Sequence, residues 1–137
     1  LSTLEEKNAI PYLTGDFFRR LFLELKDHIL YVRWGDEAGA LFYYDDSRLY
    51  GRYWGSRTFV PNLHFELCYY QGIEFAIERK LSVFEAGAQG EHKIARGFRP
   101  VLTSSAHRLN HPDFSRAVSE FVVQERMAIR QHMDELR

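Results

Sequence analysis

The chain has little of several residue types, and each shortage excludes a class of protein. Its single cysteine, Cys68, excludes an internal disulfide and suits a reducing compartment, so a cytoplasmic protein is expected. No run of about 18 apolar residues occurs, which predicts that no helix spans a membrane. The formal net charge of −1 gives no reason to expect general binding to nucleic acid or to an anionic membrane.

What the chain does contain is enough for one globular domain. Its 137 residues, of which 45% are apolar, can fill a hydrophobic core. Aromatic residues make up 15%, and tyrosines gather in the middle of the sequence, where they suit either a core or the wall of a cleft. These tyrosines are Tyr43, Tyr44, Tyr50, Tyr53, Tyr69 and Tyr70.

Apolar periodicity predicts an α+β fold. The expected order is helix, three strands, helix, strand, glycine-rich loop, strand and helix. The first helix is expected over 14–28, the next three strands over 29–34, 38–44 and 48–54, the second helix over 61–80 and the fourth strand over 81–86. The glycine-rich loop is expected over 84–98, the fifth strand over 100–109 and the last helix from 110 onward. Short turns between the first three strands indicate an antiparallel meander, and the helix before the fourth strand indicates a parallel crossover.

Two patterns predict which side chains face the core. In the strand 48–54, alternation places Leu49, Gly51 and Tyr53 on one face and Tyr50, Arg52 and Trp54 on the other. In the helix 61–80, helical spacing predicts a buried stripe of Leu63, Leu67, Tyr70, Ile73 or Glu74, and Ile77. Glu66 and Tyr70, four residues apart, are expected to be able to touch.

The segment 84–98 is the strongest candidate for a binding loop. Gly87, Gly90 and Gly97 permit positive φ or close backbone approach. Polar residues stand among them and could hold an anionic or polar ligand: Gln89, Glu91, His92, Lys93 and Arg96. The segment matches neither common glycine-rich nucleotide motif. A solvated surface loop explains the same residues equally well.

Two other features have a structural and a functional interpretation. Arg52, flanked by aromatics, fits a cation–π stack better than a ligand clamp. His64 and Cys68 are four residues apart, as a metal pair or thiolate pair would be. Two ligands make a poor zinc site and a buried cysteine is usually inert, so no metal is expected.

Three longer segments carry a family resemblance. Tyr50-Gly-Arg-Tyr-Trp-Gly55, Leu63-His-Phe-Glu-Leu-Cys-Tyr-Tyr-Gln71 and the segment Phe84–Phe98 are similar to the bacterial FemAB-related proteins, described as GNAT-like N-acyltransferases of peptidoglycan biosynthesis or recognition. The resemblance implies a GNAT-like mixed sheet and a longer protein of two lobes, of which this chain, 1–137, would be the carboxy-terminal lobe. It implies acyl-CoA or aminoacyl-tRNA as donor and an amine, small molecule or peptide, as acceptor. The segment 55–62 lacks the pyrophosphate-loop pattern of enzymes that use acetyl-CoA.

Acyl transfer to an amine needs a base, an acid and an oxyanion site. The candidate bases are Glu66 and Glu85, with Tyr70 (or Tyr53) as the acid and backbone N–H groups near splayed strands for the oxyanion. The expected substrate-binding residues are Arg52, Trp54, Gln71, Gln89, His92, Lys93 and Arg96. Two alternatives stay open: a module of the same fold that only recognises a peptide or cell-wall precursor, or a lobe that only supports its partner. Glu85 could also form a structural salt bridge with Lys93 or Arg96.

Overall fold

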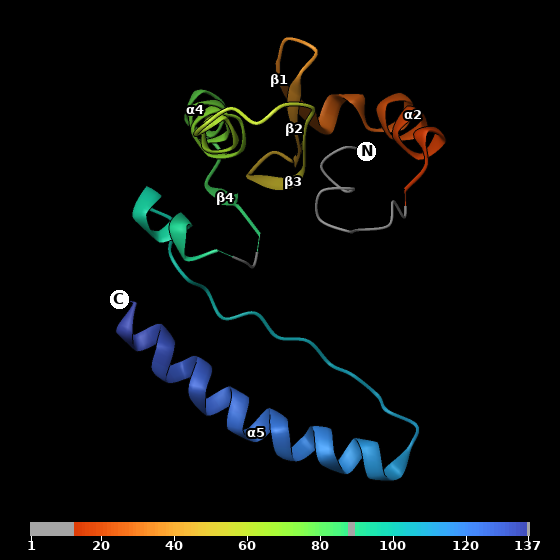
Figure 1. The fold of residues 1–137 in the computed structure, drawn as a ribbon, viewed down its shortest axis with the longest axis vertical. Coiled ribbons are helices and arrows are strands. Elements are labelled where there is room, and N and C mark those ends of the chain that lie inside the picture. The colour runs from red at the N-terminus through yellow and green to blue at the C-terminus, as the bar shows by residue number, and fades with distance from the viewer. Residues whose placement is uncertain (1–12, 88–89, 137) are drawn as a thin grey trace. The chain divides into compact units, whose positions relative to one another are not determined.

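The computed structural model describes residues 13–87 and 90–136. The chain divides into two compact units, Leu1–Gln89 and Gly90–Arg137. The first unit holds a four-stranded sheet and its helices, and the second holds a short 3₁₀ helix and one long helix (Figure 1).

The sheet has the strand order β1-β2-β3-β4, with β1 Ile29–Trp34, β2 Ala38–Tyr44, β3 Arg48–Ser56 and β4 Val83–Glu85. β1, β2 and β3 form the antiparallel meander that the short turns predicted. β4 pairs with β3 in parallel, which confirms the predicted crossover. The fold is therefore mixed α+β, as the sequence indicated.

An irregularity interrupts β3 and corrects the predicted alternation. Trp54 lies opposite Ala40 and Gly51 lies opposite Phe42, so three steps on β3 face two steps on β2. The extra residue is a β-bulge, and it reverses which side chains face the core. The prediction that Trp54 and Gly51 face opposite ways was wrong: both lie on the face of Ala40 and Phe42, because cross-strand partners point the same way.

The helix that covers this face is also irregular. It runs as α3 Leu63–Phe65, a π-helical turn Glu66–Tyr70 and α4 Gln71–Glu78. The Gln71 N–H bonds to the Glu66 carbonyl, five residues back, so the turn holds one more residue than an α-helical turn. Residues beyond it are rotated about the axis. The buried stripe is consequently Leu67, Tyr69, Gly72 and Ala76.

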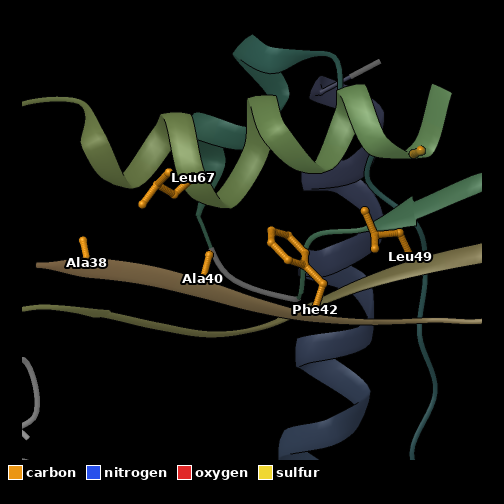
Figure 2. Packing of buried hydrophobic residues seen from close by; sticks show 6 residues of the cluster. Ala38, Ala40, Phe42, Leu49 and Leu67 are labelled. Atoms are coloured by element: carbon orange, nitrogen blue, oxygen red, sulfur yellow. The ribbon is translucent and has the colours of Figure 1, made fainter. Parts of the chain in front are cut away.

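The predicted stripe was therefore wrong in part. Tyr70 is 49% exposed and Ile77 is 72% exposed, because the π-helical turn moves both away from the sheet. The core lies between this helix and the sheet, with Leu67 on the side of the helix that faces Ala38 and Ala40 of β2 (Figure 2). Its buried members are Ala38, Ala40, Phe42, Leu49, Leu67 and Ala76.

The opposite face of the sheet contacts α2, Gly15–Glu24. The Thr14 hydroxyl accepts a hydrogen bond from the Phe17 N–H and caps this helix, as predicted. Phe18 meets Tyr53 edge-on at 5.6 Å, and Phe22 meets Tyr31 at 6.2 Å. The α-helix ends at Glu24, and a 3₁₀ turn continues to His28.

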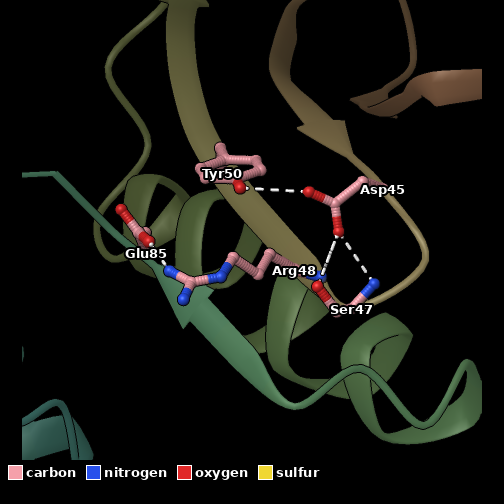
Figure 3. Close-up of polar contacts among 5 residues, drawn as sticks. All are labelled: Asp45, Ser47, Arg48, Tyr50 and Glu85. Atoms are coloured by element: carbon pink, nitrogen blue, oxygen red, sulfur yellow. Dashed lines mark hydrogen bonds and ion pairs between the residues drawn. The ribbon is translucent and has the colours of Figure 1, made fainter.

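A carboxylate organises the turn between β2 and β3. Asp45 Oδ1 accepts from the backbone N–H of Ser47 and of Arg48, each at 2.8 Å, and Oδ2 accepts from the Tyr50 hydroxyl at 3.1 Å (Figure 3). These hydrogen bonds, those from Ser47 first, lower the pKa of Asp45 to about 2. The Arg48 guanidinium reaches across to the Glu85 carboxylate at 2.6 Å and joins β3 to β4.

The second unit corrects another prediction. Pro112 begins α5, Pro112–Glu135, as predicted. Residues 100–109, however, form no strand. Val101 is 78% exposed and Leu102 is 56% exposed. The β-prone composition of this segment therefore led to a wrong prediction of a strand. A strand is stabilised by a hydrogen-bonded neighbour, and no strand of the described residues pairs with this segment.

We predict that Gly72→Ala destabilises the fold. A Cβ at this position would stand 2.8 Å from the Phe84 ring and 3.1 Å from the Phe42 ring. The helix would have to move off the sheet, which costs about 1–3 kcal/mol and exceeds the gain in helix propensity. Urea unfolding followed by circular dichroism measures the loss. Gly15→Ala is the matched control, because nothing lies within 4 Å of its added Cβ. Equal stability of the two variants would contradict the close packing.

We predict that Asp45 contributes to stability at neutral pH and loses that contribution in acid. Its pKa is lower in the folded chain than the ordinary value near 4. The ionised carboxylate therefore stabilises the fold above about pH 4, and the effect disappears as the pH falls toward about 2. Asp45→Asn should lower the urea midpoint at pH 7 and flatten its decline between pH 4 and 2. Asp46→Asn, in the same turn, should behave like the parent.

Candidate functional site

A small pocket opens where β3 and β4 separate. Their pairing covers only Arg48–Tyr50 on β3, and Ala86 follows the end of β4. The pocket has a volume of about 130 Å³, enough for a few heavy atoms of a ligand. Its walls come from β2, β3, the helix above them and the residue after β4: Ala40, Leu41, Phe42, Gly51, Arg52, Tyr53, Trp54, His64, Cys68, Tyr69 and Ala86.

The edge of β3 continues along this pocket after its pairing with β4 has ended. Beyond Tyr50, no described strand pairs with the side of β3 that faces β4. A strand edge of this kind presents N–H and C=O groups that a ligand can bind. The predicted oxyanion site, N–H groups near splayed strands, stays a prediction that this strand edge could serve.

Both irregular elements of the fold border the same pocket. Arg52 lies at the β-bulge, and Cys68 and Tyr69 belong to the π-helical turn. Such insertions weaken regular hydrogen bonding and recur next to functional sites. Their coincidence at one pocket, rather than either insertion alone, makes this the candidate site.

Three rings form the side-chain wall. His64 meets Trp54 edge-on at 5.3 Å between ring centroids and meets Tyr69 at 5.5 Å. Trp54 was among the predicted binding residues, but Tyr69 was not, and His64 was considered only as a metal or thiolate partner. Both His64 and Tyr69 lie in the segment 63–71, and the family resemblance of that segment is the signal that could have indicated them. The π-helical turn that brings Tyr69 to the pocket leaves no trace in helical spacing.

Cys68 lines the pocket as an unreactive thiol. Burial raises its pKa to about 12, so the thiolate is scarce at neutral pH. Among the described residues, no group of three or more His, Cys, Asp or Glu side chains is arranged to hold a metal ion. The His64 ring belongs to the aromatic wall, and Cys68 lines the same pocket.

Arg52 makes the predicted stack. Its guanidinium lies 5.0 Å from the centroid of the Tyr53 ring. Burial is the main cause that raises the pKa of Tyr43, and the nearby Tyr53 raises it further. The positive charge of the Arg52 guanidinium partly offsets this rise in the pKa. The side chain is exposed and keeps positive charge beside the pocket mouth.

Of the predicted acids and bases, Tyr53 lines this pocket, whereas Tyr70, Glu66 and Glu85 do not. Glu66 is exposed and accepts a hydrogen bond at 2.9 Å from the Gln71 side chain, five residues on, as the π-helical turn dictates. Tyr70 is also exposed. Glu85 is half-exposed and paired with Arg48, a partner that the sequence did not suggest.

The remaining predicted residues belong to the second unit, except Gln89, which lies outside the described residues. His92, Lys93 and Arg96 are brought together on a 3₁₀ helix, Glu91–Arg96. Arg96 donates to the His92 carbonyl at 2.7 Å, and burial lowers the pKa of Lys93. Gly87, Gly90 and Gly97 all have the positive φ that glycine permits, as expected.

We predict that Cys68 resists alkylation in the folded chain. With its pKa raised to about 12, it should react with iodoacetamide at pH 8 at least about 100-fold more slowly than in the urea-unfolded chain. Because Cys68 is the only cysteine, intact-protein mass spectrometry follows a single site. Similar rates in the two states would show that the thiol is accessible and ionised.

Comparison with known proteins supplies a family. The FemAB-like family model, described as peptidoglycan biosynthesis/recognition, matches residues 1–137. No curated protein and no solved structure gives a significant match. Within the described residues, no helix has the length and apolar character needed to cross a membrane. The family match covers the whole chain and indicates a peptidoglycan-related function, so this chain belongs to the FemAB-like family.

Proposed function

We propose that the chain transfers an acyl or aminoacyl group to an amine of a peptidoglycan stem peptide, with the reaction at the pocket between β3 and β4. The supporting observation is that a strand edge without a described partner, a β-bulge and a π-helical turn meet at one pocket. The meander followed by a helix and a parallel strand supports a GNAT-like arrangement for this unit. A second lobe in the complete protein is part of the same proposal.

The chemistry follows from the pocket walls. The acceptor is an ammonium that must lose a proton before its nitrogen can attack, and an imidazole, which ordinarily titrates near neutral pH, suits this step. His64 takes the proton, directly or through water. The nitrogen then bonds to the acyl carbon, and the carbonyl oxygen becomes an oxyanion that N–H groups on the edge of β3 stabilise.

Collapse of this intermediate breaks the bond to the leaving group. The nitrogen of the intermediate releases its second proton to water, the oxyanion reforms the carbonyl, and the bond to the leaving group breaks. The leaving thiolate of CoA or ribose oxygen of tRNA takes a proton, which completes the amide. Tyr53 and Tyr69 line the pocket and Tyr70 does not. Tyr69 is the better donor of that proton because its ring contacts His64, whereas the Tyr53 ring contacts Phe18 and Arg52. Glu66 and Gln71 act together on the exposed face of the helix and bind the acceptor amine before transfer.

The other predicted residues have supporting roles in this proposal. Glu85, held by Arg48, fixes the end of β4 where the two strands separate. Arg52 and, in the second unit, His92, Lys93 and Arg96 bind the anionic groups of donor or acceptor. The alternative is a non-catalytic module for a peptide or cell-wall precursor. It is favoured by the position of both predicted glutamate bases outside the pocket.

Transfer of label tests the proposal. The chain is incubated with [¹⁴C]acetyl-CoA or with ¹⁴C-aminoacyl-tRNA, and with a soluble stem peptide that carries a free side-chain amine. His64→Gln should lower the rate about 100-fold or more, as loss of a general base does. Tyr69→Phe should slow transfer, while Tyr70→Phe is its matched control and should keep the parental rate.

Three other results would change the conclusion. A large loss in Glu66→Gln with His64→Gln unchanged would move the base to the exposed face. Full activity in all the variants would remove the pocket as the reaction site. Saturable binding of the stem peptide without transfer from either donor would establish the binding module.

A further inference from the structure

A second and larger hollow adjoins the pocket. It lies along the end of β3, the loop after it and the start of α3, between Trp54 and Phe65, and has a volume of about 520 Å³. That is within the range of small-molecule sites, which hold about 300–1,000 Å³. Trp54 and His64 line both cavities, so the edge-to-face pair of rings borders the larger hollow on one side and the smaller pocket on the other.

The larger hollow is uncharged. Among the described residues that line it, there is no Asp, Glu, Lys or Arg, and His64 is the one ionisable side chain. A phosphate or carboxylate placed here would lose its water without gaining a charged partner, which is costly. The hollow therefore fits a neutral group, although the corresponding segment binds pyrophosphate in enzymes that use acetyl-CoA.

Its lining combines ring faces with neutral polar groups. Phe59 is 91% exposed at the tip of the loop, and Trp54 and Phe65 add further rings. Thr58 and Asn62 contribute a hydroxyl and an amide group, whereas the Ser56 hydroxyl donates to the Thr58 carbonyl at 2.5 Å. The Asn62 side chain does not cap the helix that follows, so its amide is not occupied there. Aromatic faces beside hydroxyl and amide groups suit a sugar ring, whose C–H face stacks while its edge makes hydrogen bonds.

We propose that this hollow binds an uncharged N-acetylated sugar ring of the peptidoglycan glycan and so directs the attached peptide toward His64. The class of sugar rests on the proposed function, because peptidoglycan carries such rings. The binding itself does not depend on catalysis. Phe59 supplies the stacking surface, and the Asn62 amide meets the acetamido group.

Fluorescence titration with N,N′-diacetylchitobiose, a neutral soluble probe, tests this site. Trp34→Phe removes the other tryptophan, so the signal reports Trp54 at the hollow. Saturable binding is expected, weakened at least tenfold by Phe59→Ala and by Asn62→Gly. Asn62 already has a φ of 65°, so glycine keeps the backbone while removing the amide. Phe121→Ala, at another exposed phenylalanine, should not change affinity.

Two outcomes would overturn the proposal. One is no response to the disaccharide from a chain whose circular dichroism shows it to be folded. The other is a response to octanoate but not to the disaccharide, which would assign the hollow to an acyl chain. Label transfer without sugar binding would refute this inference alone. Sugar binding without transfer would refute the proposed reaction and leave the site standing.

Discussion

The contact of Gly72 with Phe84 and Phe42 sets the geometry of the first unit. Because Gly72 has no side chain, the helix approaches the sheet closely at that point and holds the Phe84 ring of β4 against Phe42 of β2. Because the helix is held against the sheet at Gly72, the turn before Gly72 must also direct its apolar side chains toward the sheet. The π-helical turn does this, since it places Leu67 and Gly72, five residues apart, on one side. The pocket lies beside this turn.

The sequence predicted the regular parts of this unit well. The meander, the crossover and the Thr14 cap follow from local signals: turn residues, apolar alternation and a side-chain acceptor before a helix. Each signal is contained within a few residues. Elements that form for local reasons are the ones that a single sequence reveals.

The site was less predictable, because its geometry depends on two inserted residues. A β-bulge at Arg52 and a π-helical turn at Glu66–Tyr70 each break a period without a distinctive residue type to mark the break. Regular spacing therefore placed Tyr70 inside and Trp54 on the wrong face. The predicted strand 100–109 failed for the opposite reason. Its composition suits a strand, but strand formation depends on a neighbour that local sequence does not specify.

The buried thiol of Cys68 has a consequence for any activated donor. A thioester or an aminoacyl ester exchanges readily with a thiolate, so an ionised cysteine in the pocket wall would capture the acyl group and become self-acylated. With its pKa near 12, Cys68 stays a protonated spectator. The pocket thus gains a small, polarisable wall atom without a competing nucleophile, as direct transfer from donor to amine in the proposed reaction would need.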